Sequence, residues 1–301
     1  MSLQIGIDHI HGGDVAKESH LQSREALLTS LLVLAWMVEA RDPYTGGHLW
    51  RVSRFARILA SDAGLSQADV ARISIGGFLH DIGKISVPDH ILGKKDRLTD
   101  QEYEVIKAHP EVGWRVLAEH PLADLAEAAV RSHHETPDGK GYPKGLSGYT
   151  IPIDARIVGI CDAFDAMTST RPYRRGMSVD KALSIIEENL TTQFDDSLGQ
   201  RFIALGRAGG LDHVVGHTDE GIPLRECTVC GPTLVLKRNQ AVGDRIYCQS
   251  CTGEYITEEH GGQLVTISTG RLGSPKALEP QTDIALIKEF VRASSRAQLA
   301  A

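Results

Sequence analysis

Histidines and aspartates recur through a stretch of the chain that is otherwise patterned as helices, and this recurrence most constrains the fold. Each falls inside or near the end of a predicted helix, and a helical bundle can project such side chains inward to one point. Imidazole and carboxylate ligands together suit iron, manganese, zinc and related divalent ions. The sequence therefore predicts a helical scaffold around a metal site. The candidate ligands are His48, His80, Asp81, His109, His133, His134 and Asp162.

Any one of these histidines is weak evidence for a metal site. A single histidine in a helix is more often a surface or core residue than a ligand, and one His-Asp pair proves little. Packing gives no reason, however, for an adjacent His133-His134 pair in the same helical region as His80-Asp81. The set as a whole favours metal binding.

Apolar residues recur at helical spacing through the first two-thirds of the chain, where strand signals are nearly absent. Ser66 and Thr99 are predicted helix N-caps, the latter with Glu102 completing a capping box. Residues 1–20 are polar and are predicted to be a loose leader. The predicted helices cover residues 20–40, 49–63, 67–81, 100–109, 111–119, 122–134, 152–167, 179–189 and 196–208.

The pattern changes near residue 219. Gly, Pro and Cys separate short β-like runs at 233–236, 245–247 and 264–268, and an amphipathic helix is predicted at 283–292. We therefore expect a mainly α protein in four parts. These are the leader (1–20), a helical metal-binding domain (21–218), a small β-rich module (219–269), and a linker with a C-terminal helix (270–301).

Cysteine spacing assigns a second metal to the small module. Cys227 and Cys230 form one Cys-x-x-Cys pair, and Cys248 and Cys251 form another. Four thiolates suit tetrahedral zinc, and a segment this small needs the metal to fold. The pattern predicts one structural zinc in a zinc-ribbon-like module, ahead of free thiols or disulfides. Such a module is either a purely structural element held together by its metal or a docking surface for a protein. Mixed charge makes nucleic acid the weaker choice of partner.

Bulk properties narrow the class of protein. A hydrophobic fraction of 42% and a charged fraction of 24% are ordinary for a soluble globular chain, and the net charge of -7 disfavours nucleic-acid binding. The longest mostly apolar stretch, 26–38, is short for a membrane span, and no signal peptide opens the chain. We therefore expect a cytoplasmic protein with no membrane segment.

Several long segments resemble the HD-GYP group of the HD phosphohydrolase superfamily, and the resemblance covers roughly residues 25–206. The segments are 42–48 (DPYTGGH), 80–84 (HDIGK), 133–143 (HHETPDGKGYP), 168–174 (TSTRPYR) and 193–195 (QFD). The resemblance implies an all-helical HD-GYP bundle and a metal-dependent phosphodiesterase.

The resemblance also implies how the ligands divide between two ions. One metal would be held by His48, His80, Asp81 and Asp162. Asp81 would bridge to a second metal held by His109, His133 and His134, with iron or manganese expected in both positions. Some members bind a third metal through a glutamate four positions before the first histidine; Tyr44 occupies that position here, so we expect a binuclear site.

Catalytic and substrate roles follow from the same resemblance and from charge. Asp81 and Lys84 are the expected catalytic residues, with a hydroxide bridging the metals as nucleophile. The expected substrate contacts are Lys84, Tyr142, Arg171 and Arg174, although a solvated surface role for Arg174 is equally favoured. The loop 139–143, which contains Gly-Tyr-Pro, is either a rigid turn or a ligand contact, and the resemblance implies that it also contacts diguanylate cyclase partners.

By resemblance, the substrate is cyclic di-GMP, opened to pGpG and further to GMP. Two alternatives stay open. The substrate is a related dinucleotide, such as cyclic GMP-AMP or pGpG itself. Or the domain is a catalytically weak adaptor that binds nucleotide or a cyclase and acts through the zinc module. A homodimer is left open.

Overall fold

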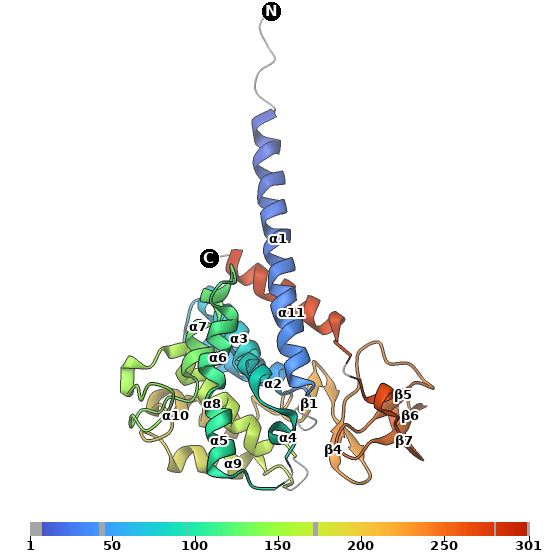
Figure 1. The fold of residues 1–301 in the computed structure, drawn as a ribbon. Coiled ribbons are helices and arrows are strands. Elements are labelled where there is room, and N and C mark those ends of the chain that lie inside the picture. Colours follow the sequence, from blue (N-terminus) through green and yellow to red (C-terminus); the bar gives the residue numbers. More distant parts are fainter. Residues whose placement is uncertain (1–7, 42–45, 95, 171–173, 280, 300–301) are drawn as a thin grey trace, which may run out of the picture.

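Helices form the first two-thirds of the chain, and short strands and a last helix follow (Figure 1). This computed structural model describes the backbone of residues 8–41, 46–94, 96–170, 174–279 and 281–299, and side chains from 18 to 295 within those ranges. The α-helices before the strands are α1 (Asp8–Glu39), α2 (His48–Asp62), α3 (Gln67–Leu79), α4 (Asp89–Leu92), α5 (Asp100–Lys107), α6 (His109–Leu117), α7 (Glu127–Ser132), α8 (Ile153–Thr168), α9 (Val179–Glu188) and α10 (Asp196–Arg207). The 3-10 turns are η1 (Ile82–Ser86), η2 (Ala123–Leu125), η3 (Gly148–Thr150) and η4 (Pro275–Leu278).

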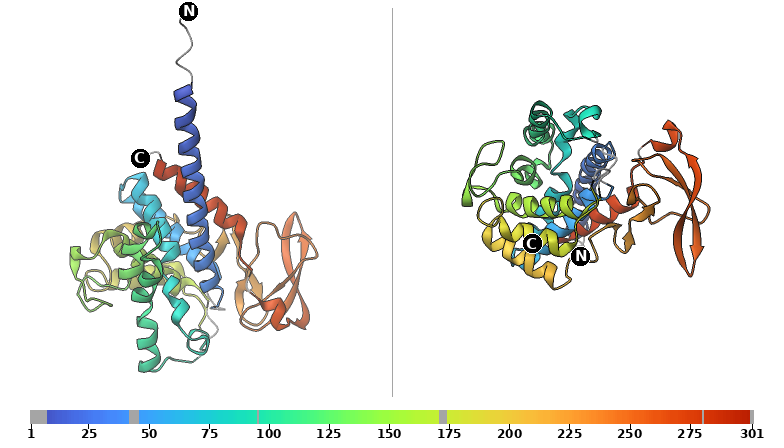
Figure 2. Two further views of the ribbon diagram at one scale, coloured as in Figure 1. Left: turned by 45° about the horizontal axis from the view of Figure 1, so that its top comes forward. Right: turned by 90° about the horizontal axis from the view of Figure 1, so that it is seen from below.

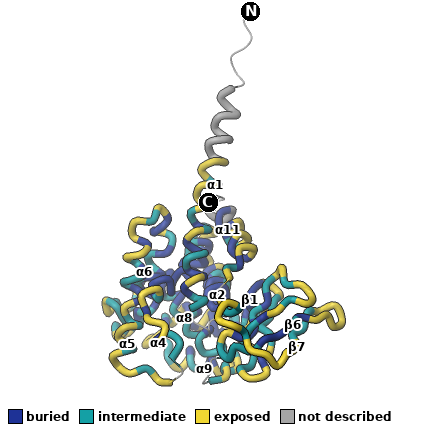
Figure 3. The backbone as a smooth tube through the Cα atoms, turned by 45° about the vertical axis from the view of Figure 1, so that its right-hand side comes forward, coloured by how far each residue is buried: buried dark blue, intermediate teal, exposed yellow. Residues whose placement is uncertain are grey.

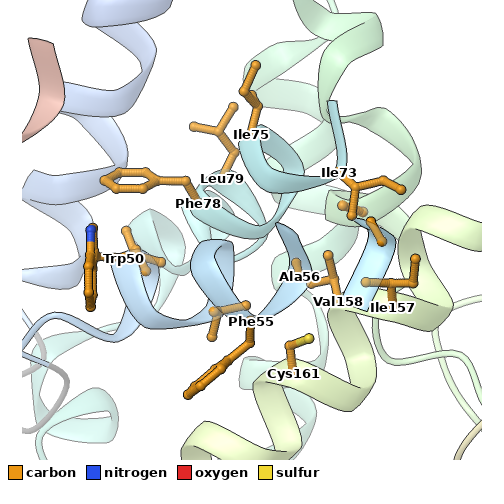
Figure 4. Packing of buried hydrophobic residues seen from close by; sticks show 14 of the residues in the cluster. Trp50, Phe55, Ala56, Ile73, Ile75, Phe78, Leu79, Ile157, Val158 and Cys161 are labelled. Carbon is orange, nitrogen blue, oxygen red and sulfur yellow. The ribbon is translucent and has the colours of Figure 1, made fainter. Parts of the chain in front are cut away.

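One continuous apolar core joins these α-helices, apart from α4 and α5, which contribute no residue to it. Phe55 of α2, Phe78 of α3 and Phe164 of α8 are fully buried in it. Figure 4 shows the apolar side chains of α2, α3 and α8 meeting from three directions. Because the helices of this core present apolar stripes at helical spacing, burying those stripes together yields the bundle.

The predicted helix starts are confirmed. The Ser66 side chain accepts a hydrogen bond from the backbone N–H of Asp69 at 3.1 Å and begins α3. Thr99 and Glu102 exchange both bonds of a capping box at the start of α5. Helix α3 ends directly before His80, and α5 leads into His109 at the start of α6, so the two capped helices lead to candidate ligands.

The N-terminal expectation was wrong. Helix α1 begins at Asp8, so residues 8–20 are helical rather than loose, while residues 1–7 lie outside the described residues. Its first turns extend away from the bundle (Figure 1). Nearer the bundle the helix contains buried residues (Figure 3), among them Leu31 and Leu32. By length and composition alone, the segment 18–39 of α1 would also be long and apolar enough to cross a membrane.

The C-terminal part contains small antiparallel sheets. Strands β1 (His217–Asp219) and β2 (Ile222–Pro223) pair, as do β3 (Arg225–Cys227) and β4 (Gly231–Leu234). A third sheet has the order β5 (Arg245–Tyr247), β6 (Gly253–His260), β7 (Gln263–Leu272). Cys227, Leu234, Cys248 and Tyr255 belong to the small core between them. The expected class, a helical bundle followed by a β-rich cysteine module and a C-terminal helix, is confirmed.

The last helix returns to the bundle. Helix α11 (Ile284–Leu299) packs against α1 and α3, with Leu286, Ile287 and Val291 buried in the helical core. Figure 2 shows α11 crossing beside α1 while the strands lie to one side. The cysteine module is therefore an insertion between α10 and α11. In addition, β7 continues to Leu272, through the start of the expected linker.

Candidate metal centre

Five helices bring the predicted ligands together at one place. His48 begins α2, His80 and Asp81 follow α3, His109 begins α6, His133 and His134 follow α7, and Asp162 lies within α8. Three sets of ligand atoms each lie within 4.8 Å of one another: His109, His133 and His134; His48, His80 and Asp162; His80, Asp81 and His133. All seven side chains thus share one centre.

Asp81 lies between two groups of imidazoles. Its Oδ2 is 3.4 Å from Nε2 of His80 and 3.7 Å from Nε2 of His48. Its Oδ1 is 3.4 Å from Nε2 of His109. Each carboxylate oxygen therefore faces a different set of imidazoles, which is the arrangement that a carboxylate bridging two ions requires.

Backbone carbonyls fix how three of the imidazoles are protonated. A carbonyl oxygen only accepts, so each Nδ1 must carry the proton, and each Nε2 is left with a lone pair that can bind a metal. The three bonds, each 2.8 Å, join His80 Nδ1 to Gly77, His109 Nδ1 to Ile106, and His133 Nδ1 to Ala129.

Two buried atoms test whether this centre fits metal ions. Nε2 of His80 and Oδ1 of Asp81 have no hydrogen-bond partner among the described residues. Leaving such atoms unsatisfied costs about 1–3 kcal/mol each, and an ion coordinated by both would remove that cost. The donor set and its orphaned atoms therefore fit divalent metals.

A pair of residues that we did not predict holds His48. Nδ1 of His48 lies 2.8 Å from Oδ2 of Asp165, and the Asp165 carboxylate accepts a bond of 2.6 Å from Nε of Arg51. Asp165 lies one helical turn after Asp162 in α8, and this spacing was the available signal, because residues three apart share a helix face. Carboxylates in this position orient metal-bound histidines and raise their basicity.

Electrostatics separate the imidazoles into two kinds. Burial would lower the pKa of His48, but hydrogen bonds to Asp165 and Asp81 outweigh it and raise the pKa to about 10. Burial lowers the pKa of His109 to about 4 and that of His134 to about 3. The latter two are neutral near pH 7, the form that binds a metal.

Residues 32–198, more than half of the chain, match the HD domain family. The chain belongs to the HD domain family.

Curated relatives share this region. The chain is 38% identical over 183 residues to the cyclic di-GMP phosphodiesterase response regulator RpfG of Xanthomonas campestris, covering 60% of this chain and 48% of that protein. It is 38% identical over 196 residues to the 3'3'-cGAMP-specific phosphodiesterase 3 of Vibrio cholerae, covering 64% and 42%. It is 36% identical over 192 residues to a cyclic di-GMP phosphodiesterase of Thermotoga maritima, covering 63% and 52%. The chain thus spans about half the length of these relatives.

Two of the residues expected to contact substrate lie at the candidate metal centre of the HD domain, and a third is bound to backbone. Lys84 Nζ is 2.5 Å from Oδ2 of Asp81. The ring of Tyr142 stacks on that of His134, with 4.7 Å between centroids. The guanidinium of Arg174 instead donates to the backbone carbonyl of Ala166. Arg171 and Tyr44 lie outside the described residues. Lys84 and Tyr142 therefore border the centre, and Arg174 is engaged by backbone.

Buried Glu135 organises the loop that carries Tyr142. Its carboxylate accepts bonds from the backbone N–H groups of Lys144 at 2.7 Å and Leu146 at 2.8 Å. The sequence pattern did not single out Glu135, although it directly follows the His133-His134 pair. Because one carboxylate binds two backbone N–H groups of this loop, it fixes the turn that holds Tyr142 against His134.

The second cluster lies in the cysteine module, outside the region matched to the HD domain family. The sulfurs of Cys227, Cys230, Cys248 and Cys251 all lie within 4.8 Å of one another, and those of Cys227 and Cys251 are 3.5 Å apart. The Tyr255 hydroxyl donates to Cys227 Sγ at 3.2 Å. Four converging thiols on two knuckles fit the tetrahedral geometry of zinc.

Proposed function

We propose that this chain hydrolyses a phosphodiester bond of a cyclic dinucleotide, with cyclic di-GMP as the first candidate, at two divalent ions. The observation that carries the proposal is the position of Asp81, whose two oxygens face separate groups of imidazoles. The names of the relatives from Xanthomonas campestris and Thermotoga maritima support this choice of substrate.

The proposed ligand sets follow the geometry. His48, His80, Asp81 and Asp162 would hold one ion, and Asp81, His109, His133 and His134 the other. Iron and manganese suit this mixture of imidazole and carboxylate. When bound, such a pair of ions would supply hydroxide at neutral pH by lowering the pKa of a bound water, and pGpG is the product we propose.

The chain's own residues orient and stabilise what reacts. Lys84 places an ammonium beside Asp81, where it would offset charge that grows on the phosphate oxygens in the transition state. Tyr142, held flat against His134, offers an aromatic face and a hydroxyl at the edge of the centre. A hollow of about 210 Å³ lined by His134, Asp162 and Gln193 reaches the centre from another side.

A second dinucleotide is also supported. The relative named as specific for 3'3'-cGAMP is as similar to this chain, at 38% identity, as the relative from Xanthomonas campestris. The imidazole, carboxylate and ammonium groups described around the centre suit metal and phosphate rather than a particular base. Cyclic GMP-AMP is therefore the second candidate substrate.

Turnover of defined substrates tests the proposal. Protein loaded with Mn²⁺ or Fe²⁺ without oxygen should convert cyclic di-GMP to pGpG, with cyclic GMP-AMP and pGpG assayed in parallel. Asp81→Asn should abolish product formation, while Asp124→Asn, the same change at an exposed carboxylate, should leave it intact. The proposal is wrong if metal-loaded protein binds cyclic di-GMP but releases no product from any of the three nucleotides. That result would favour an adaptor that binds the nucleotide without turnover.

A further inference from the structure

The whole guanidinium of Arg51 is hydrogen-bonded inside the protein. It is among the largest fully buried side chains, with 1% of its surface exposed. A guanidinium has about five N–H donors in a rigid fork, and the structure supplies a bond for each. Nε donates to Asp165 Oδ1 (2.6 Å), Nη2 to Asp165 Oδ2 (3.0 Å) and Ser169 Oγ (3.1 Å), and Nη1 to the carbonyls of Gly46 (2.8 Å) and His217 (3.0 Å).

One end of this fork faces the metal centre. The Asp165 carboxylate that accepts two bonds from Arg51 also holds Nδ1 of His48 at 2.8 Å. That contact orients the ring so that Nε2 lies 3.4 Å from Oδ1 of Asp162. Among the described residues, the side-chain hydrogen bonds of Arg51 go to neither ligand, so we infer that it acts on His48 through Asp165.

The other end holds the C-terminal module. His217 is the first residue of β1, and its carbonyl is one of the two that Nη1 binds. The start of α2 lies directly against this strand and against Arg51: a Cβ on Gly47 would meet the Cα of Thr218 and Nη1 of Arg51 at 3.0 Å each, and the oxygen of His217 at 3.2 Å. Thr218 is buried, and its hydroxyl lies 3.3 Å from the carbonyl of Leu236, just beyond β4. Strand β1 therefore links α2 to the body of the cysteine module.

We infer that Arg51 is a positioning residue that couples the seating of β1 against α2 to metal binding at His48. The inference rests on the metal centre of the proposed function. Moving β1 away would remove the His217 carbonyl from Nη1, which would then be held by the Gly46 carbonyl alone. The weaker anchoring of the fork would loosen Asp165 and with it His48. Coupling between two sites is reciprocal, so metal binding at His48 must in turn hold β1 more firmly.

Mn²⁺ affinity of the full chain tests the first half of this coupling. Arg51→Lys keeps the charge but has no fork to span Asp165 and His217, and it should weaken Mn²⁺ binding about 10–100-fold, the range for losing support behind a metal ligand. Manganese is counted separately from zinc by elemental analysis, so the cysteine module does not obscure the result.

A matched pair of glycines tests the contact from the module side. Gly47 and Gly64 flank α2 with φ of 77° and 76°, so alanine is equally strained at both, but only at Gly47 does the added Cβ meet other atoms. Gly47→Ala should weaken Mn²⁺ binding, and Gly64→Ala should bind Mn²⁺ as the wild type does. Circular dichroism at the assay temperature selects variants that remain folded.

Hydrogen exchange tests reciprocity without any measure of activity. Adding Mn²⁺ to the wild type should slow exchange of amides in β1 and β2, residues 217–223, and this slowing should disappear in Arg51→Lys. The coupling is overturned if folded Arg51→Lys binds Mn²⁺ as tightly as the wild type. It is also overturned if Mn²⁺ does not change the exchange of the β1 amides in the wild type. Either result leaves the proposed function standing. A wild type that takes up no Mn²⁺ or Fe²⁺ overturns the proposed function itself.

Discussion

The imidazoles of the candidate metal centre differ in their pKa. His109 and His134 are buried, and burial lowers their pKa to about 4 and about 3. His48 meets carboxylates, which overcome the effect of its burial and raise its pKa to about 10. A neutral imidazole is ready to bind a cation, whereas a proton on His48 would have to leave as the metal arrives.

Acid should destabilise the metal-free protein between about pH 6.5 and pH 4. The unfolded chain protonates His109 near pH 6.5, but the folded chain does so only near 4, so unfolding takes up a proton in this window. The loss would be about 3 kcal/mol from His109 alone. His48 does not mask it, because the stability from its raised pKa is complete below pH 6.5 and is lost only as the pH rises toward 10.

Thermal or urea unfolding of chelator-treated protein at pH 7 and pH 5 measures the part of this loss that falls above pH 5, about 2 kcal/mol. The His109→Gln variant cannot take up that proton and should lose less stability over the same interval. Equal losses in the variant and the wild type would contradict the assignment to His109.

Replacing Lys84 should slow chemistry more than it weakens binding. Its ammonium lies 2.5 Å from Asp81, at the centre itself. If it stabilises charge that develops in the transition state, Lys84→Gln should lower kcat about 10²–10³-fold with KM and metal content little changed. Lys181→Gln, at an exposed position of α9, is the matched control. A normal kcat in metal-replete Lys84→Gln would remove this role.

Among the elements, α11 changes how the chain is divided. Its apolar face lies in the same core as α1 and α3, and Phe290 packs on Phe78 with 5.2 Å between ring centroids. A helix after the cysteine module thus completes the bundle that precedes it. We infer that α11 contributes to the stability of the helical domain rather than to that of the module.

Two isoleucines in α11 make this testable. Ile287 is fully buried and Ile284 is 42% exposed. Ile287→Ala should lower the free energy of unfolding of the helical domain by about 2–5 kcal/mol, because it removes buried methyl groups and leaves a cavity. Ile284→Ala should change it by less than about 0.5 kcal/mol. Denaturant unfolding followed by helical circular dichroism compares them, and equal effects would argue against docking of α11.

For the whole molecule, two candidate metal centres of different chemistry lie in two differently built parts. The helical centre draws ligands from five helices with a large core behind them. The cysteine module has a core of only a few side chains, two of which are the cysteines Cys227 and Cys248. Its folding should therefore depend on its ion far more than that of the helical domain does.

Zinc analysis separates the two. The wild type should hold one zinc per chain in the module, and Cys248→Ser should lose it together with the hydrogen-exchange protection of β3 to β7. The helical signal of the bundle should survive. Cys161→Ala is the matched control, since this fifth cysteine is buried in the helical core and the cluster of four does not include it. Full zinc occupancy in Cys248→Ser would contradict a site made of four thiolates.

Local patterns in the sequence were enough to predict the helical class, the caps at Ser66 and Thr99, the cysteine cluster and the seven candidate ligands. These features depend on residues a few positions apart, or on motifs read within one segment. They missed the start of α1 at Asp8, because its polar first turns have no apolar stripe, and they missed β6, whose glutamates obscure the strand pattern.

The sequence by itself determined which side chains could bind metal, since residue type and spacing decide that chemistry. Only the tertiary structure decided how they are held. Arg51 reaches Asp165 across 114 positions and His217 across 166, and α11 returns past the whole cysteine module to reach α3. Sequence periodicity predicts contacts within one helix or between neighbouring strands. Contacts such as those of Arg51 form only when distant segments pack together, because burial of its charge then requires hydrogen-bond partners from those segments.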